Sequence, residues 1–351
     1  MLPISVCIIA KNEEKNIEKC LKSLEPYGFE IVIVDTGSTD KTKEIAFKFT
    51  DKVYDFEWID DFSAARNYSL KMASNKWIFM MDCDEWIESI DIEELEYFRK
   101  NLSNAAGSVN RENITGSPEN PGAITIDRTE RFFNKQQYHY TGIIHEQLTP
   151  KFNKDFETFL LNTTIGHSGY CMTDTDRLNK SKRNVELLLK QLEAEPENPY
   201  VYYQLGKGYQ MIDDDNKAYE YFGKGLEFDI DPSLAYVQAM VIEYGYTLLK
   251  LGKSEDALGF EGIYEEFKSS ADFVYLMGLI YLENKQYEAA INQFSKATEF
   301  EFANREGVNS YLANFQIGKI LLMAGEKDMA RKYLSMCGGY GPAVEMLTKI
   351  Q

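Results

Sequence analysis

Residues 77–85 (WIFMMDCDE) place carboxylate side chains directly after a wholly apolar run. The run Trp77–Met81 is typical of a strand that is buried on both faces of a parallel sheet. Asp82 and Asp84 follow its carboxyl end, where open α/β sheets place their ligands. Their hard oxygen atoms suit Mg²⁺ or Mn²⁺, ions that usually carry the phosphates of a nucleotide. The alternative is an acidic turn that caps the next helix, and Cys83 between the carboxylates is more typical of a small neutral filler than of a metal ligand.

Two further polar clusters also follow predicted strands. Asn12–Glu14 come after the apolar run Ile4–Ala10, and Asp35–Asp40 come after Glu30–Val34. The carboxyl ends of parallel strands converge on one edge of a sheet. We therefore expect the three clusters to form one pocket, although they lie far apart in the sequence.

The elements that must position these clusters alternate between strand and helix. We expect strands at residues 4–10, 30–34, 52–56 and 77–81, and helices at residues 13–24, 40–49 and 63–73. This alternation predicts an α/β domain with a parallel sheet and helices on both of its faces. The polar stretch Asn101–Gly122 predicts a loop at the rim of the site, followed by short strands at Ala123–Asp127 and Arg131–Phe133.

From about Asn184 onward the pattern is helical throughout. Four glycines each precede an alanine by twelve residues: Gly206 and Ala218, Gly245 and Ala257, Gly278 and Ala290, and Gly318 and Ala330. Small residues let paired helices approach closely, and the units of about 33 to 40 residues have the period of tetratricopeptide helix pairs, which the pattern resembles. Peptide or protein binding is the expected role of such repeats, and formation of a homodimer is the alternative.

Composition excludes several classes of protein. The chain has 351 residues, which favours two domains. Its net charge of −18, without a basic cluster, argues against nucleic acid and anionic membranes as main partners. The sequence shows neither a signal peptide at its start nor an apolar run approaching the roughly 18 residues of a membrane span. Five scattered cysteines without CxxC spacing fit reduced thiols, so we expect a cytoplasmic protein.

The N-terminal segments together resemble family 2 glycosyltransferases of the GT-A fold. The matching segments are Val6–Glu14, Ile31–Asp40, Phe62–Asn67 and Met81–Glu85. The resemblance implies a Rossmann-like nucleotide-sugar domain with a mostly parallel sheet at residues 1–170, a helical linker at 171–197 and an all-α repeat domain at 198–351. Because of the repeats, the chain is similar to bacterial members of the family that glycosylate peptides or proteins, such as the sublancin-type S-glycosyltransferases.

The resemblance also implies a binding site for a UDP-sugar donor. Asp35 is expected to accept hydrogen bonds from the uracil or the ribose, because an ionised carboxylate pairs well with such donors. Asn12 and Glu13 border the base and the ribose, and Arg66 reaches the base or the diphosphate. The other donor-site residues are Ala10, Gly37, Ser38, Asp82 and Cys83. Glu13 is alternatively a charge in the first turn of a helix.

A surface ion pair is the alternative role of Arg66, with Asp60 or Asp61 as the partner. Such a pair would remove Arg66 from the donor site.

The same resemblance assigns the metal ligands and the base. Asp84 is the expected ligand of a divalent ion that joins both phosphates, Asp82 lies near the ribose or the metal, and His167 is the third ligand. A structural histidine is the alternative for His167. Glu146 is the candidate general base that deprotonates the acceptor, with His145 as its competitor. Glu146 is alternatively a structural carboxylate.

These assignments predict an inverting, metal-dependent enzyme. It would move a hexose or N-acetylhexosamine from a UDP-sugar to a peptide or protein acceptor that the repeats recruit. One alternative acceptor is a surface polysaccharide or a lipid-linked sugar. The other alternative is an inactive transferase that serves as a repeat scaffold.

Overall fold

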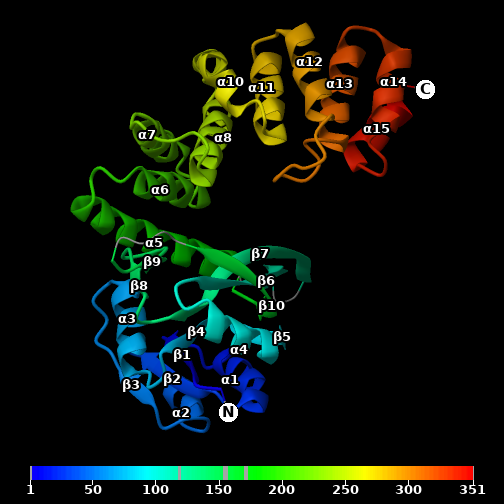
Figure 1. Ribbon diagram of the computed structural model, residues 1–351. Coiled ribbons are helices and arrows are strands. Elements are labelled where there is room, and N and C mark those ends of the chain that lie inside the picture. The colour runs from blue at the N-terminus through cyan, green and yellow to red at the C-terminus, as the bar shows by residue number, and fades with distance from the viewer. Residues whose placement is uncertain (1, 118–119, 153–156, 170–172, 351) are drawn as a thin grey trace. The chain divides into compact units, whose positions relative to one another are not determined.

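The computed structural model describes residues 2–117, 120–152, 157–169 and 173–350, and it forms two compact units, Met1–Gln191 and Leu192–Gln351 (Figure 1). The predicted boundary between residues 170 and 171 lies outside the described residues. Within the described ranges, no helix has the length and apolar character needed to cross a membrane.

The first unit is built on an eight-stranded sheet with the order β3-β2-β1-β4-β7-β6-β10-β5. Its strands are β1 (Ile4–Ala10), β2 (Glu30–Asp35), β3 (Val53–Asp55), β4 (Trp77–Asp82), β5 (Glu85–Ile90), β6 (Ala106–Ser117), β7 (Asn120–Asn134) and β10 (Thr158–His167). Strands β1 to β4 pair in parallel, whereas β7 pairs antiparallel with β4 and with β6. The alternation of strands and helices therefore predicted the fold class of this half correctly.

Helices and a small hairpin cover the two faces of this sheet. The helical elements that pack in its two cores are α1 (Ile17–Leu24), the short 3-10 helix η1 (Glu25–Tyr27), α2 (Thr42–Ala46), α3 (Phe62–Met72) and α4 (Ile92–Asn101). Helix α5 (Asp174–Ala194) extends past Gln191, the last residue of this unit. Two further strands, β8 (Tyr138–Thr141) and β9 (Gln147–Pro150), form a separate two-stranded sheet.

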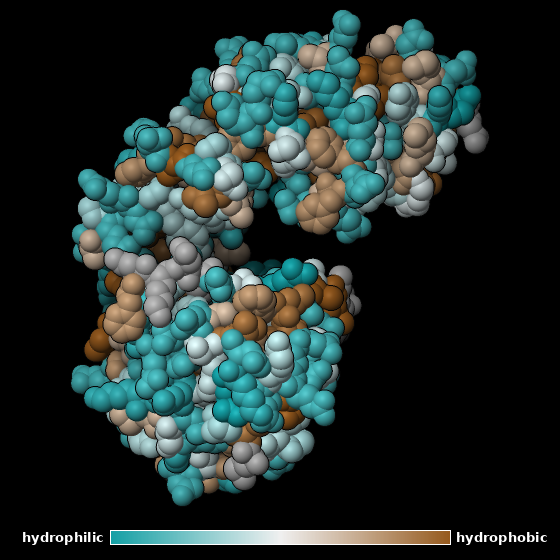
Figure 2. Space-filling model, in the orientation of Figure 1, coloured by the Kyte–Doolittle hydropathy of each residue, from teal (hydrophilic) through white to brown (hydrophobic). Residues whose placement is uncertain are grey.

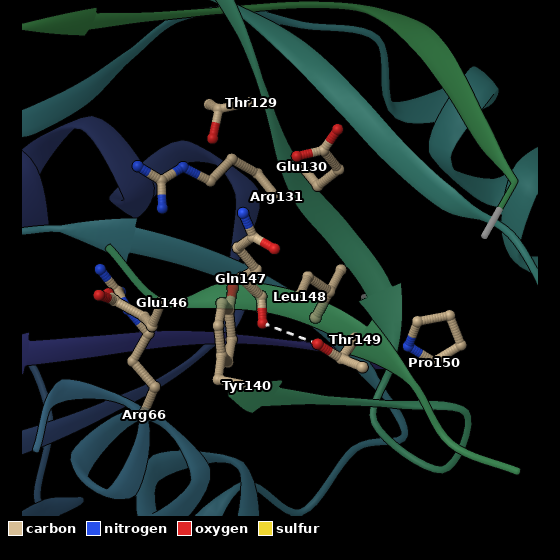
Figure 3. Close-up of a pocket in the computed structure, with 10 residues that line it drawn as sticks. All are labelled: Arg66, Thr129, Glu130, Arg131, Tyr140, Glu146, Gln147, Leu148, Thr149 and Pro150. Carbon is tan, nitrogen blue, oxygen red and sulfur yellow. Dashed lines mark hydrogen bonds and ion pairs between the residues drawn. The ribbon is translucent and has the colours of Figure 1, made fainter. Parts of the chain in front are cut away.

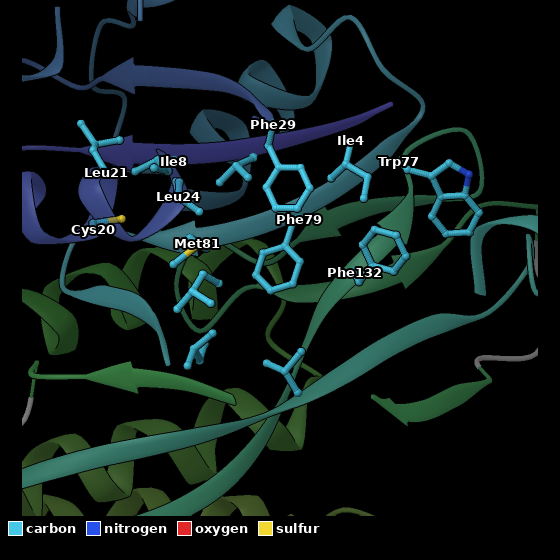
Figure 4. Close-up of a cluster of buried hydrophobic side chains, with 14 of the residues drawn as sticks. Ile4, Ile8, Cys20, Leu21, Leu24, Phe29, Trp77, Phe79, Met81 and Phe132 are labelled. Atoms are coloured by element: carbon cyan, nitrogen blue, oxygen red, sulfur yellow. The ribbon is translucent and has the colours of Figure 1, made fainter. Parts of the chain in front are cut away.

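Side chains of the central strands alternate between two buried cores. Phe79 and Met81 of β4 join one core with residues of α1 and α4 (Figure 4), whereas Ile78 and Met80 join the other core with α3 and β8–β9. A strand buried on both faces must be apolar throughout, which explains the run in residues 77–81. The cysteines that the structure describes are free and buried, and Cys171 lies outside the described residues.

The predicted loop at Asn101–Gly122 is wrong. Strands β6 and β7 form a long antiparallel hairpin there, and the two predicted strands at residues 123–127 and 131–133 belong to the single strand β7. Figure 2 shows apolar side chains gathered over this part of the visible face, where Ile124 and Ile126 of β7 are 60% and 64% exposed. Because both faces of the hairpin mix polar and apolar side chains, the sequence has no clear period of two.

The second unit consists of helices. They are α6 (Pro199–Met211), α7 (Asp215–Leu226), α8 (Ala235–Lys250), α9 (Ser254–Ala257), the 3-10 helix η2 (Leu258–Ile263), α10 (Tyr264–Phe267), α11 (Ala271–Glu283), α12 (Tyr287–Ala297), α13 (Tyr311–Met323), α14 (Lys327–Ser335) and α15 (Gly341–Lys349). Successive helices pack as pairs, α6 on α7, α11 on α12 and α13 on α14, which confirms the predicted repeat architecture.

The repeated glycines leave room for large side chains of the second helix. A Cβ atom at Gly206 would lie 2.3 Å from the Phe222 ring, and one at Gly278 would lie 2.6 Å from the Phe294 ring. Both rings are fully buried, sixteen residues after their glycines. At Gly206 and Gly278 the glycine thus makes room for a ring inside its own helix pair, whereas Gly245 and Gly318 face the leucines Leu276 and Leu334; all four alanines are buried.

Candidate active site

Two loops at the carboxyl ends of β1 and β2 are joined by hydrogen bonds from backbone N–H groups to side-chain oxygens. The Asn12 N–H donates to Ser38 Oγ at 2.9 Å, and the Thr39 N–H donates to Asn12 Oδ1 at 2.8 Å. The Glu13 N–H donates to Thr42 Oγ1 at 2.7 Å. Asn12 has a φ of +56°, a left-handed conformation that asparagine tolerates better than most residues. These contacts delay the start of α1 to Ile17, later than the sequence predicted.

Asp35 lies at the base of these loops, and only one of its two carboxylate oxygens accepts hydrogen bonds from the described residues. It is 2% exposed, and its Oδ2 accepts hydrogen bonds from the N–H groups of Gly37 at 3.1 Å and Ser38 at 2.9 Å. Gly37 has a φ of +99°, which requires glycine. Asp35 Oδ1 is buried and has no hydrogen-bond partner among the described residues. A buried carboxylate oxygen without a donor is costly, so this atom is available to a ligand that donates.

Glu13 and Ala10 lie beside this position. Glu13 Oε2 accepts a hydrogen bond from Asn16 Nδ2 at 2.8 Å. Burial raises the pKa of Glu13, and the nearby carboxylate of Asp84 raises it further. Ala10 is buried, and its carbonyl oxygen accepts from the Thr36 N–H at 2.8 Å, so its backbone joins β1 to the loop after β2.

Asp82 is held by two buried arginines. Arg66 Nη2 lies 2.8 Å from Asp82 Oδ1, and Arg131 Nη2 lies 2.9 Å from Asp82 Oδ2. Burial raises the pKa of Asp82, but the two guanidinium groups outweigh it and hold the pKa well below its usual range. The same arginines continue the network, Arg66 to Glu146 and Arg131 to Glu85.

This network excludes the surface ion pair considered for Arg66. Arg66 is 8% exposed, and its ion-pair partners among the described residues are Asp82 and Glu146. Asp61 instead caps α3 by accepting from the Ala64 N–H at 2.9 Å, and Asp60 pairs with Lys190.

Asp84 turns away from the arginines toward His167. His167 Nε2 lies 3.4 Å from Asp84 Oδ2, and His167 Nδ1 lies 2.7 Å from Asn113 Oδ1. If Nδ1 donates to the Asn113 oxygen in a neutral ring, the proton is on Nδ1, and Nε2, which faces Asp84, is the nitrogen that can bind a cation. Among the described residues, no three His, Cys, Asp or Glu side chains are arranged around one metal position. A cation here would therefore take further ligands from elsewhere.

A glycine keeps space beside these two groups. A Cβ atom at Gly169 would lie 2.3 Å from Asp84 Oδ2 and 2.4 Å from His167 Nε2. Cys83, in contrast, points into the core: it is 4% exposed, and its Sγ donates to the Ile9 carbonyl at 3.4 Å. Burial raises the pKa of its thiol well above the usual value.

Glu146 lines a cavity of about 520 Å³ next to this network. The cavity is lined by Arg66, Thr129, Glu130, Arg131, Tyr140, Glu146, Gln147, Leu148, Thr149 and Pro150. In Figure 3 the side chains of Arg66 and Glu146 lie against each other at one end, and Leu148 to Pro150 run along another side. His145 is exposed, has a φ of +52° and is not among the lining residues.

The sequence model of the family described as "Glycosyl transferase family 2" matches residues 5–164. Residues 5–164 are therefore similar to the glycosyltransferase family 2 domain. The matched range contains Asp35, Arg66, Asp82, Asp84 and Glu146 and ends just before His167.

Similar proteins include transferases and a repeat protein. The SPbeta prophage-derived glycosyltransferase SunS of Bacillus subtilis (strain 168) is 29% identical over 228 residues, 64% of this chain and 53% of that protein. A TPR repeat-containing protein of Synechococcus elongatus is 28% identical over 229 residues, 62% of this chain and 55% of that protein. The lipopolysaccharide core biosynthesis glycosyltransferase LpsC of Rhizobium meliloti is 29% identical over 160 residues, 43% of this chain and 59% of that protein. The chain thus spans about half the length of the first two relatives.

The structure adds residues to the candidate active site that the sequence did not reveal. Arg131 is the extra residue of a β-bulge in β7, opposite Gly107 and Ser108 of β6. Bulges re-aim side chains next to active sites, and this one accompanies the approach of the Arg131 guanidinium to Asp82. The only indication in the sequence that Arg131 belongs to the site was weak, namely a single arginine inside a predicted strand. Asn113 gave no signal, because it lies in the stretch predicted to be a loop.

Proposed function

We propose that this chain is an inverting, metal-dependent glycosyltransferase that moves a hexose or N-acetylhexosamine from a UDP-sugar to a peptide or protein acceptor. The observation that carries the proposal is Asp35 Oδ1, a buried oxygen without a described partner at the strand edge of a family 2 domain. Uracil and ribose both offer N–H or O–H donors to such an oxygen. Asn12, Glu13 and Ser38 border the same position, with Ala10 and Gly37 contributing backbone.

A divalent ion, Mn²⁺ or Mg²⁺, fits the Asp84 and His167 pair. A carboxylate oxygen of Asp84 and the imidazole Nε2 of His167 lie 3.4 Å apart, and a side chain larger than hydrogen at Gly169 would collide with both. Asp82 serves this site indirectly, because both of its oxygens are engaged by arginines. When bound, the ion would offset the charge that grows on the departing diphosphate.

Glu146 is the proposed general base. The acceptor atom forms a bond to the anomeric carbon as the bond from that carbon to the UDP oxygen breaks; UDP leaves with the electron pair, and Glu146 takes the acceptor proton. Arg66 positions the Glu146 carboxylate by an ion pair. We favour Glu146 over His145 because Glu146 lines the cavity.

The repeats are the proposed recruiting surface for the acceptor, with a homodimer as the other role. The similarity to a protein named SunS, a glycosyltransferase, and to a TPR repeat-containing protein supports this combination. A second candidate acceptor is a saccharide, favoured by the similarity to a lipopolysaccharide core biosynthesis glycosyltransferase.

Calorimetry with UDP tests the donor site. Asp35→Ala should weaken UDP binding by about 1.5–3 kcal/mol, the range for a hydrogen bond to a charged group. Asp55→Ala is the matched control, because Asp55 is an exposed carboxylate of neighbouring β3 that pairs with Lys43. Equal UDP affinity in both variants would remove Asp35 from the site. Absence of UDP-sugar hydrolysis with Mn²⁺ across a panel of donors would overturn the enzymatic function itself.

A further inference from the structure

The small sheet beside the cavity has one closed edge and one open edge. Its two strands, β8 and β9, pair with Tyr140 opposite Leu148. The outer edge of β8 is closed by a side chain: Asn67 Nδ2 donates to the Tyr140 carbonyl at 2.8 Å, and the Tyr140 N–H donates to Asn67 Oδ1 at 2.9 Å. Tyr140 therefore directs both backbone groups away from β9.

This geometry fixes the direction of the Leu148 backbone. In an antiparallel pair, opposite residues direct their N–H and C=O groups either both toward each other or both outward. Since Tyr140 points outward, the Leu148 N–H and C=O also point outward, away from β8. Within the described part of the chain, no hydrogen bond involves either group. The Leu148 side chain is 9% exposed and packs in the core with Met80 and Phe133, so the strand is held firmly in place.

The open edge of β9 belongs to the cavity that contains the candidate base. Leu148, Thr149 and Pro150 line it, and Glu146 lies one residue before β9 begins. The opposite wall is the segment Thr129–Arg131 of β7, beyond the last residue pair of β4 and β7 at Phe79 and Phe132. A volume of about 520 Å³ lies within the usual range of ligand pockets.

We propose that the open edge of β9 is the acceptor subsite, and that it takes an extended polypeptide segment as a third strand of the small sheet. One peptide residue exchanges two backbone hydrogen bonds with Leu148, and a neighbouring residue brings its hydroxyl, thiol or amide to Glu146. An extended peptide supplies an N–H and a C=O on the same side of one residue, which is the pattern that an open strand edge recognises. Saccharide hydroxyls can also donate and accept, but they do not repeat at the regular spacing of a strand ladder. The inference rests on the proposed function and narrows its acceptor to non-helical peptide segments.

A backbone N-methylation scan of an acceptor peptide tests the inference on the unaltered protein. A pool of nine-residue peptides, each with one Ser, Thr, Cys or Asn, is incubated with Mn²⁺ and a panel of UDP-sugars, and intact mass identifies the modified peptide. Single N-methyl groups are then placed along that peptide. We expect methylation to lower kcat/KM about tenfold at one position next to the modified residue and to have little effect one residue further along, because N–H groups alternate in direction along a strand.

Two results would overturn the inference and leave the donor chemistry standing. One is transfer that is insensitive to N-methylation or equally sensitive at every position. The other is UDP-sugar hydrolysis without transfer to any peptide in the pool. Absence of UDP-sugar hydrolysis would instead mark failure of the proposed function.

A pair of variants examines the same contact from the protein side. Leu148→Pro removes the N–H that faces the cavity, a change that an edge strand accommodates, whereas Leu148→Ala keeps the N–H and removes more of the side chain. Peptide transfer per UDP-sugar hydrolysed should be about tenfold lower in Leu148→Pro than in Leu148→Ala. Equal ratios in the two variants would contradict strand addition at β9.

Discussion

Asp82 and Asp84 are two residues apart in the sequence, yet their surroundings give them different roles. Asp82 faces two guanidinium groups, which balance its charge and fix its direction. Asp84 Oδ2 lies 3.4 Å from His167 Nε2, so a cation beside this pair would meet a carboxylate oxygen and an imidazole nitrogen. The sequence grouped both residues as possible metal ligands, because spacing alone does not show where each side chain points.

Gly169 provides a test of the metal site that leaves both proposed ligands in place. Gly169→Ala would put a methyl group 2.3 Å from Asp84 Oδ2 and 2.4 Å from His167 Nε2. We expect the dissociation constant for Mn²⁺ in the presence of UDP to rise about tenfold or more, because the methyl group would push both proposed ligands out of position. Mutations that misorient metal ligands typically weaken metal binding by about this factor. Electron paramagnetic resonance of free Mn²⁺ measures this directly.

Gly259→Ala is the matched control, since no atom lies within 4 Å of a Cβ built at Gly259. Asp84→Ala gives the reference for loss of a ligand. Unchanged Mn²⁺ affinity in both Gly169→Ala and Asp84→Ala would place the metal elsewhere.

At the scale of elements, one partly buried carboxylate ties the amino ends of several strands together. Glu30 at the start of β2 accepts hydrogen bonds from groups on β1, on the segment before β3 and on the segment between α3 and β4. The donors are Ser5 Oγ, Lys52 Nζ, the Ser74 N–H at 2.9 Å and Asn75 Nδ2 at 3.4 Å. Burial raises the pKa of Glu30, but these donors outweigh it and lower the pKa to about 2.

This shift predicts how stability depends on pH. The folded-state pKa of Glu30 is about 2 and its ordinary value is 4.5, so its stabilising contribution is present above pH 4.5 and is lost as pH falls toward 2. Glu30→Gln should lower the free energy of unfolding by about 1.5–3 kcal/mol at pH 7, with a smaller difference from the unaltered protein at pH 3. Urea unfolding followed by tryptophan fluorescence reports on the first unit, because the three tryptophans, Trp58, Trp77 and Trp86, all lie in it.

Glu14→Gln controls for removal of an acidic group from the same unit, since Glu14 is an exposed loop residue. If Glu30→Gln lowered the free energy of unfolding by the same amount at pH 7 and at pH 3, that result would contradict the role assigned to the Glu30 charge.

How well the sequence predicted each element depended on how that element is buried and paired in the fold. Strands β1, β2 and β4 were predicted within a residue, because burial on both faces leaves an apolar run bounded by polar loops. The β6–β7 hairpin was missed, because tertiary pairing makes strands of residues whose composition favours a loop. In the candidate site, the side chains at the carboxyl ends of strands were predictable from topology. Arg131 and Asn113 were not, because their places depend on a bulge and on that hairpin.

At the scale of the whole molecule, the glycine and alanine spacing makes the repeat period visible in the sequence, but the helix pairs are not identical. The helix pair that begins with α8 departs from the others: its second helix is replaced by the short segments α9, η2 and α10. Gly245 there faces Leu276 of α11, whereas Gly206 and Gly278 face rings of their own helix pairs. At this irregular helix pair, side chains of α6, α8 and the segment before α13 contact one another within the second unit. Their positions in the sequence do not follow the repeat period.

This meeting point is a mixed-charge and aromatic surface that suits a peptide. Gln210 Nε2 donates to Glu243 Oε2 at 3.3 Å, and the Arg305 guanidinium lies 4.2 Å from the centre of the Tyr246 ring. The Tyr246 hydroxyl is buried and has no hydrogen-bond partner among the described residues. Peptide backbones can supply donors and acceptors to such groups.

If the repeats recruit the acceptor, changes on this surface should alter acceptor kinetics. Arg305→Ala is expected to raise the acceptor KM roughly three- to tenfold, the scale of a stacked, partly desolvated cation, while slow UDP-sugar hydrolysis continues at its former rate. Binding energy remote from the reacting atoms acts in this way when it serves capture of the substrate. Lys224→Ala is the matched control, because Lys224 lies on α7, pairs with Glu220 and is half exposed. An unchanged acceptor KM together with loss of a dimer in analytical ultracentrifugation would show that the surface joins two copies of the chain, and the recruiting role would then be wrong.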